Sequence, residues 1–179
     1  NENDPEGIWN QAPSWVKDTL RNVFLPTTSK PIADAILRGT CVALTDGSYD
    51  PSTNLATACW IIESDENGNR AKGASQTPGN ETDMDAYRAE LYGIYCILLS
   101  IKYIIDYFQI DGGSIKLICD CKGALTRAVI YDNRPTTRHP NYNLLWAIFD
   151  LRDDLDIDIT WEHVKGHQDD AELDHELTH

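Results

Sequence analysis

The chain has 179 residues and a mass of 20.1 kDa, and 41% of its residues are apolar, 9% aromatic and 25% charged. These proportions are typical of one folded globular domain and exclude a collagen-like or fully disordered chain. A net charge of −14 and an isoelectric point near 4.5 argue against passive electrostatic binding to a phosphate backbone or an anionic membrane.

The charge is distributed unevenly along the chain. Residues 1–69 carry a net charge of −6, residues 70–149 carry +1, and residues 150–179 carry −9. An acidic block of this kind is typical of a solvated face or a tail. A nucleic-acid function would therefore depend on the nearly neutral central segment and on local compensation of charge.

Five cysteines occur in apolar runs, and they form no C-x-x-C pair. An odd number without metal-type spacing predicts small buried hydrophobic residues in a reducing compartment. No signal peptide is recognised, and the apolar run at 94–101 is too short to span a bilayer. We therefore expect an intracellular protein, cytoplasmic or nuclear, and a start at Asn1 suggests a piece of a longer chain.

Residues 1–38 are predicted to form a helical N-terminal extension or a linker from an upstream domain. Ser14 is placed to cap a first helix, and Pro31 to open a second. We expect Trp9 and Trp15 to pack against the main body of the protein.

A second unit, residues 39–179, has a different hydrophobic period. Three β-rich runs separated by turn residues predict an antiparallel meander, and a long amphipathic helix follows. A buried strand, two helices and an alternating strand complete the order βββαβααβ. The predicted strands are 41–45, 55–63, 70–77, 115–119 and 157–163, and the predicted helices are 84–105, 122–130 and 143–152.

Three carboxylates occupy positions that suggest a shared site. Asp46 closes the first strand, Asp120 closes the fourth, and Glu90 lies in the first turns of the long helix. Polar residues at the ends of buried strands project into the crevice where α/β sheets bind ligands. Clustered carboxylates repel one another unless a cation neutralises them, and ligands that are all oxygen favour Mg²⁺ or Mn²⁺.

Each of these signals alone also fits a turn residue, a helix cap or a favourable interaction with the helix dipole. A fourth element, the Gly166-His167 pair directly after the last strand, strengthens the combination. At this point the chain resembles the type 1 ribonuclease H family, and most of all the ribonuclease H domains of retroelement reverse transcriptases. The residues that carry this resemblance are Thr45-Asp46-Gly47-Ser48, Tyr87-Arg88-Ala89-Glu90-Leu91, Ile118-Cys119-Asp120 and Val164-Lys165-Gly166-His167.

The resemblance implies an α/β ribonuclease H-like fold, with three antiparallel strands, two parallel strands and helices on both faces of the sheet. It implies hydrolysis of the RNA strand of RNA–DNA hybrids with two divalent metal ions, Mg²⁺ or Mn²⁺ in its place, about 3.5 to 4 Å apart. Asp46, Glu90 and Asp120 would be catalytic metal ligands, with Asp46 bridging both ions. His167 would shuttle a proton or help product release.

The family has a fourth carboxylate in a helix after the Gly-His loop. We expect this residue, and that helix, to lie beyond His179, because Asp169, Asp170 and Asp174 are weak substitutes for it. If the protein stops at His179, activity is doubtful, since that ligand helps to hold the metal that activates water.

The resemblance also places substrate contacts on the chain. Ser48, Arg88 and Lys122 are candidate contacts with the hybrid backbone, and recognition should rest on shape and 2′-hydroxyls. His163, which alternates with Trp161 in the last strand, is predicted to pack or cap rather than to catalyse. A covalently linked upstream polymerase domain is the expected partner.

Two alternatives remain open at this stage. The first alternative is a DNA-processing nuclease, because transposases, integrases and junction resolvases use acidic clusters on the same scaffold. An inactive or structural module within a larger polyprotein is the other. The Gly-His loop and the Tyr-Arg-Ala-Glu-Leu helix argue against the first. Retention of three carboxylates argues against the second, whereas the missing fourth carboxylate keeps it open.

Overall fold

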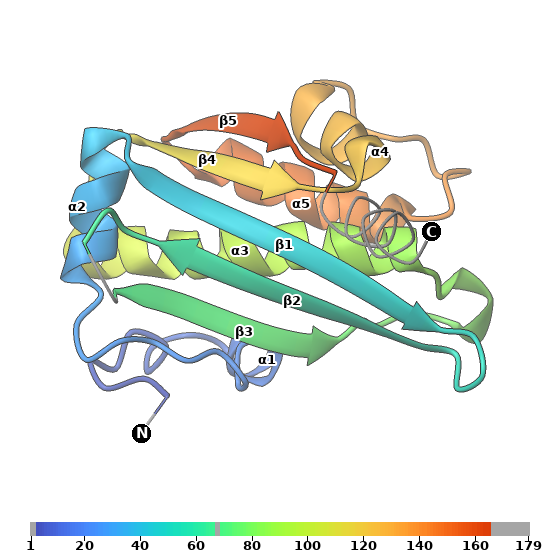
Figure 1. Cartoon of the computed structure of the whole chain (residues 1–179), viewed down its shortest axis with the longest axis horizontal. Coiled ribbons are helices and arrows are strands. Elements are labelled where there is room, and N and C mark those ends of the chain that lie inside the picture. The colour runs from blue at the N-terminus through green and yellow to red at the C-terminus, as the bar shows by residue number, and fades with distance from the viewer. Residues whose placement is uncertain (1–2, 67–68, 166–179) are drawn as a thin grey trace, which may run out of the picture.

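A five-stranded mixed sheet organises the computed structural model, which describes residues 3–66 and 69–165 (Figure 1). Its order is β3-β2-β1-β4-β5; β1 pairs antiparallel with β2 and β2 with β3, whereas β4 is parallel to β1 and β5 to β4. This arrangement confirms the predicted sheet. The strands are β1 (Cys41–Asp50), β2 (Leu55–Glu63), β3 (Arg70–Gln76), β4 (Ser114–Cys119) and β5 (Asp158–His163).

In the described part of the chain, the helical elements are five α-helices, one short 3₁₀ helix and one short π-helix. The predicted helix at 122–130 is shorter as an α-helix, because its second half continues in π geometry. The helical elements are α1 (Ser14–Thr19), α2 (Lys30–Arg38), η1 (Glu81–Asp83), α3 (Ala86–Phe108), α4 (Lys122–Leu125), η2 (Thr126–Ile130) and α5 (Tyr142–Asp154).

The long helix α3 is the centre of the core. The Asp85 side chain caps it by accepting from the Arg88 backbone N–H at 2.7 Å, and Gln109 ends it in the left-handed conformation. By length and composition α3 could cross a membrane, but it is mostly buried here, against β1, β2 and α5. Figure 1 shows α3 and α5 behind the sheet.

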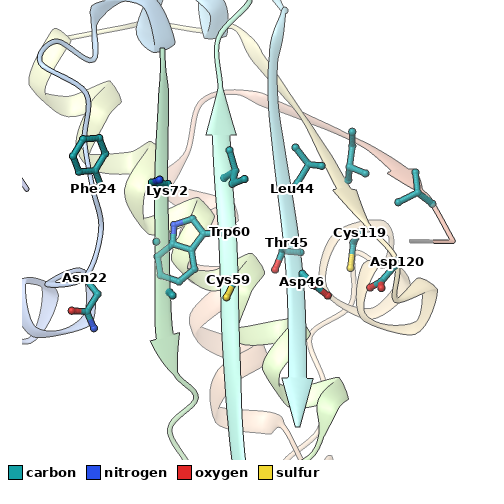
Figure 2. A pocket seen from close by; sticks show the side chains of 15 residues that line it. Asn22, Phe24, Leu44, Thr45, Asp46, Cys59, Trp60, Lys72, Cys119 and Asp120 are labelled. Carbon is teal, nitrogen blue, oxygen red and sulfur yellow. The ribbon is translucent and has the colours of Figure 1, made fainter. Parts of the chain in front are cut away.

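Side chains of the strands alternate between that helix-covered face and a second face. Ala43, Ala58, Trp60 and Ile62 are buried on the helix side. Leu44, Cys59 and Ile61, with part of β3 and β4, line a cavity of about 650 Å³ on the other side (Figure 2). Because period-2 alternation puts Cys59 on this second face, it is exposed, and the prediction that all five cysteines are buried is wrong for it.

The N-terminal segment is packed into the same core. Its apolar side chains are buried, and the Phe24 and Lys72 backbones exchange hydrogen bonds of 2.7 and 3.0 Å at the β3 edge. Trp9 is buried and meets Tyr103 edge to face, whereas Trp15 is 54% exposed, which corrects the expectation for it. The buried apolar residues of this segment are Ile8, Trp9, Ala12, Val16, Leu20, Val23 and Leu25.

The start of α1 also differs from the sequence prediction. Pro13 holds the cap position and Ser14 is the first helical residue, with no side-chain hydrogen bond at the cap. Pro31 does lie at the start of α2, as predicted, since its fixed φ suits the first helical turn.

Candidate active site

The site is built where β4 ends and β1 continues. The last pair between these parallel strands is Thr45 with Cys119, yet β1 extends to Asp50 because β2 still pairs with it. Asp46 therefore lies inside a strand, opposite Cys59, and not at a strand end as predicted. The physical reason is the β1–β2 ladder, which carries the chain beyond the local apolar run.

Glu90 of α3 fills the position beside β1 where β4 no longer runs. Its side chain is 4% exposed, and its Oε1 accepts from the Gly47 backbone N–H at 2.7 Å. A Cβ at Gly47 would lie 2.7 Å from the Glu90 backbone nitrogen and 2.9 Å from the Ala89 Cβ. A glycine after Asp46 thus allows α3 to approach β1 closely enough for this bond.

Asp120 follows β4 directly, and β5 holds its backbone in place. The His163 Nε2 lies 2.9 Å from the Asp120 carbonyl oxygen, and the Val164 N–H donates to the Cys119 carbonyl at 3.1 Å. His163 thus supports the turn after β4, in agreement with the structural role predicted for it.

Three ligand-type side chains meet at this point: Glu90, Cys119 and Asp120 offer donor atoms within 4.8 Å of one another. Cys119 was missed as a site residue, although its place before Asp120 and its strand parity with Leu117 point it toward α3. Asp46 is outside that cluster, but it lines the same cavity as Asp120, on the neighbouring strand (Figure 2). The structure thus brings Glu90 and Asp120 together and places Asp46 next to them through Gly47.

Burial and charge make this site favourable for a cation. Burial is the main cause that raises the pKa of Glu90 to about 8, and the neighbouring Asp120 charge adds to it, while the Gly47 hydrogen bond opposes it. A divalent cation would offset both unfavourable effects, and carboxylate oxygens are hard ligands of the kind that Mg²⁺ and Mn²⁺ prefer. The Glu90 and Asp120 carboxylates therefore fit such an ion.

The predicted substrate contacts lie in different environments. Ser48 is exposed on β1, on the same face as Asp46, and Lys122 is exposed at the start of α4. Arg88 is only 8% exposed, because its Nε donates to the Pro78 carbonyl at 2.7 Å and its Nη1 to the Asn141 Oδ1 at 2.8 Å. Its guanidinium thus joins α3 to two loops.

The remaining predicted residues, His167, Asp169, Asp170 and Asp174, lie outside the described residues.

Comparison with known proteins identifies the class of fold. No protein-family model matches the sequence, and no curated protein matches it at a significant level. Among solved structures, RNase H1 from the halophilic archaeon Halobacterium salinarum NRC-1 is similar with a TM-score of 0.51 and 19% identity, over 73% of this chain and 89% of that one. LC11-RNase H1 in complex with an RNA/DNA hybrid is similar with a TM-score of 0.55 and 14% identity, over 72% of this chain and 87% of that one.

The chain therefore has the ribonuclease H fold. Within that class, both of these neighbours are RNase H1 structures, and the similarity covers most of each of them.

Proposed function

We propose that this protein is a metal-dependent endoribonuclease that hydrolyses the RNA strand of RNA–DNA hybrids. The observation that carries the proposal is the buried Glu90 carboxylate held beside Asp120 at the end of β4, in a ribonuclease H fold. Burying the Glu90 carboxylate next to the half-buried Asp120 is costly without a cation, so this arrangement supports a catalytic metal site. One structural neighbour was solved with an RNA/DNA hybrid.

The proposed cofactor is a pair of divalent cations, Mg²⁺ or Mn²⁺. Bound cations would supply charge stabilisation at the scissile phosphate and acidify the attacking water. Asp46, Glu90 and Asp120 would bind them, and Gly47 would orient Glu90 through its backbone N–H. His167 is proposed to move a proton or assist product release.

The proposed substrate surface is the exposed region around this site. Ser48 and Lys122 would contact the hybrid backbone. Both side chains are exposed, and they follow Asp46 and Asp120 in the sequence. Arg88 has no such role in this proposal, because its guanidinium is committed to Pro78 and Asn141. With a net charge of −14, affinity for the hybrid should be weak and sensitive to salt.

A cleavage assay on matched substrates tests the proposal. Hybrid, RNA duplex and DNA duplex of one sequence are incubated with the full-length protein in Mg²⁺ or Mn²⁺. We expect cleavage of the RNA strand of the hybrid alone, and its loss in Asp120→Asn. Asp111→Asn, which removes the same charge from an exposed residue before β4, is the matched control and should stay active.

The alternatives predict other results in the same assay. Preferential cleavage of the DNA duplex would assign a DNA-processing nuclease. Absence of divalent-cation binding by calorimetry, together with absence of cleavage, would assign an inactive module.

The biological context is a separate proposal that rests on sequence resemblance alone. We propose that the chain belongs to a retroelement reverse transcriptase, with a polymerase domain upstream, and acts in the cytoplasm or nucleus. Sequencing the transcript upstream of Asn1 would test this, and a reading frame without polymerase motifs would contradict it.

A further inference from the structure

The Cys119 thiol lies between the two carboxylate positions of the site. It is 1% exposed, and its Sγ is 3.3 Å from the Glu90 Oε2. The same sulfur accepts from the Cys121 backbone N–H at 3.4 Å, a contact that spans Asp120. A thiol can donate weakly and accept weakly, so one side chain can serve both contacts.

The thiol contact adds to the hydrogen bonding of Glu90. The Gly47 N–H already holds Oε1, which leaves the carboxylate able to turn about its last side-chain bond. The thiol holds Oε2, so that both oxygens are fixed, one from β1 and one from β4. The contact to Cys121 fixes the backbone turn that carries Asp120.

We propose that Cys119 is a positioning residue that couples the orientation of Glu90 to the turn bearing Asp120. A catalytic role for this coupling rests on the proposed function. The coupling itself exists in the protein without cations. Cys119 acts through Glu90 and the Cys121 backbone and does not touch substrate. An alanine in its place would release both groups, whereas a serine would keep a donor and an acceptor.

Amide hydrogen exchange of the cation-free chain tests the coupling directly. In Cys119→Ala, the Cys121 amide loses its acceptor, and the Gly47 amide is bonded to a Glu90 carboxylate that the thiol no longer holds. Exchange at both amides should accelerate about fivefold, as expected for the loss of one weak hydrogen bond. Cys119→Ser should restore both rates to near those of the wild type. Cys41→Ala is the matched control, because Cys41 is equally buried at the other end of the β1–β4 pair. Unchanged amides in Cys119→Ala, or equal acceleration in both alanine variants, would overturn the proposal.

Cation titration by calorimetry separates positioning from direct ligation. A positioning role predicts that Cys119→Ala weakens Mg²⁺, Mn²⁺ and Cd²⁺ by a similar factor, about fivefold, and that Cys119→Ser restores all three. A selective loss of Cd²⁺ affinity in Cys119→Ser would show that the sulfur is itself a ligand, which contradicts positioning. If the wild type binds no cation while the exchange pattern holds, the proposed function fails and the coupling stands.

Discussion

The Gly47 backbone N–H donates to the Glu90 Oε1 at 2.7 Å, so the residue that follows Asp46 on β1 binds the carboxylate that α3 contributes. This bond exists because β4 ends at Cys119, which leaves the side of β1 beyond Thr45 without a strand partner there. The hydrogen bond from Gly47 thereby brings two proposed metal ligands, Asp46 and Glu90, next to each other.

Replacing Gly47 by alanine should disturb both the packing and the site. The added Cβ would meet the Glu90 backbone nitrogen and the Ala89 Cβ, so α3 must shift. We expect Gly47→Ala to lower the free energy of unfolding by about 1–3 kcal/mol, measured in urea, and to weaken Mn²⁺ binding. Gly123→Ala is the control, because its Cβ would meet Tyr87 at an ordinary 3.5 Å. Equal stability of the two variants would contradict the close-packing argument.

Stability of the cation-free protein should depend on the protonation of Glu90. Its pKa is raised in the folded state to about 8, from an ordinary value of 4.5, so the folded state keeps a proton that the unfolded state loses. The stabilisation that this proton gives is complete below about pH 4.5 and is lost as the pH rises through about 8. Over that range the free energy of unfolding falls by no more than about 1.4 kcal/mol per pH unit. Urea unfolding from pH 5 to 9 in the presence of a chelator measures it.

Two substitutions control that pH series. Glu90→Gln, which mimics the protonated carboxyl, should flatten the dependence, and Glu81→Gln at an exposed position should leave it unchanged. A slope that survives in Glu90→Gln would assign the titration to another group.

Substitutions of Arg88 should affect stability, whereas substitution of Lys122 should affect binding of the hybrid. Arg88→Ala leaves the Pro78 carbonyl and the Asn141 side chain unpaired, so we expect a loss of about 2–3 kcal/mol in the free energy of unfolding. Arg88→Lys should not restore it, because an ammonium lacks the planar fork. Lys122→Ala should change stability by less than about 0.5 kcal/mol, yet weaken binding of a labelled hybrid and reduce its salt dependence. An Arg88→Ala variant with wild-type stability and impaired binding would reverse these assignments.

Thiol labelling should single out Cys59. Among the five cysteines, Cys59 is exposed and Cys121 half-buried, whereas burial raises the pKa of Cys41 to about 12 and also raises that of Cys96 and Cys119. Iodoacetamide followed by mass spectrometry should therefore modify Cys59 first.

The same labelling reports on the charge at Asp46. Partial burial and the Asp46 carboxylate both raise the pKa of Cys59. Asp46→Asn should lower that pKa and speed the labelling near neutral pH, and Asp111→Asn should not. An unchanged rate in Asp46→Asn would place the two groups farther apart than β1–β2 pairing implies.

Several sequence predictions hold because they depend on local patterns. The alternation of β2 and the spacing along α3 reflect which face of each element is buried, and the structure confirms both elements. The surroundings of a single side chain depend on distant parts of the sequence. Loop carbonyl and amide groups 10 and 53 residues away from Arg88 bury its guanidinium. Trp15 was expected to pack against the main body, but α1 buries Val16 and leaves Trp15 exposed.

By itself, the sequence determined the order of strands and helices and the mixed sheet, since hydrophobic period and turn residues are local properties. It also singled out three candidate carboxylates. Only the tertiary structure decided that Glu90 and Asp120 meet and that the residue after Asp46 binds Glu90. The bond between Gly47 and Glu90 joins residues 43 positions apart, and the contact between Cys119 and Glu90 joins residues 29 apart. Both depend on the point where β4 stops beside a longer β1, which strand pairing sets and no local pattern encodes.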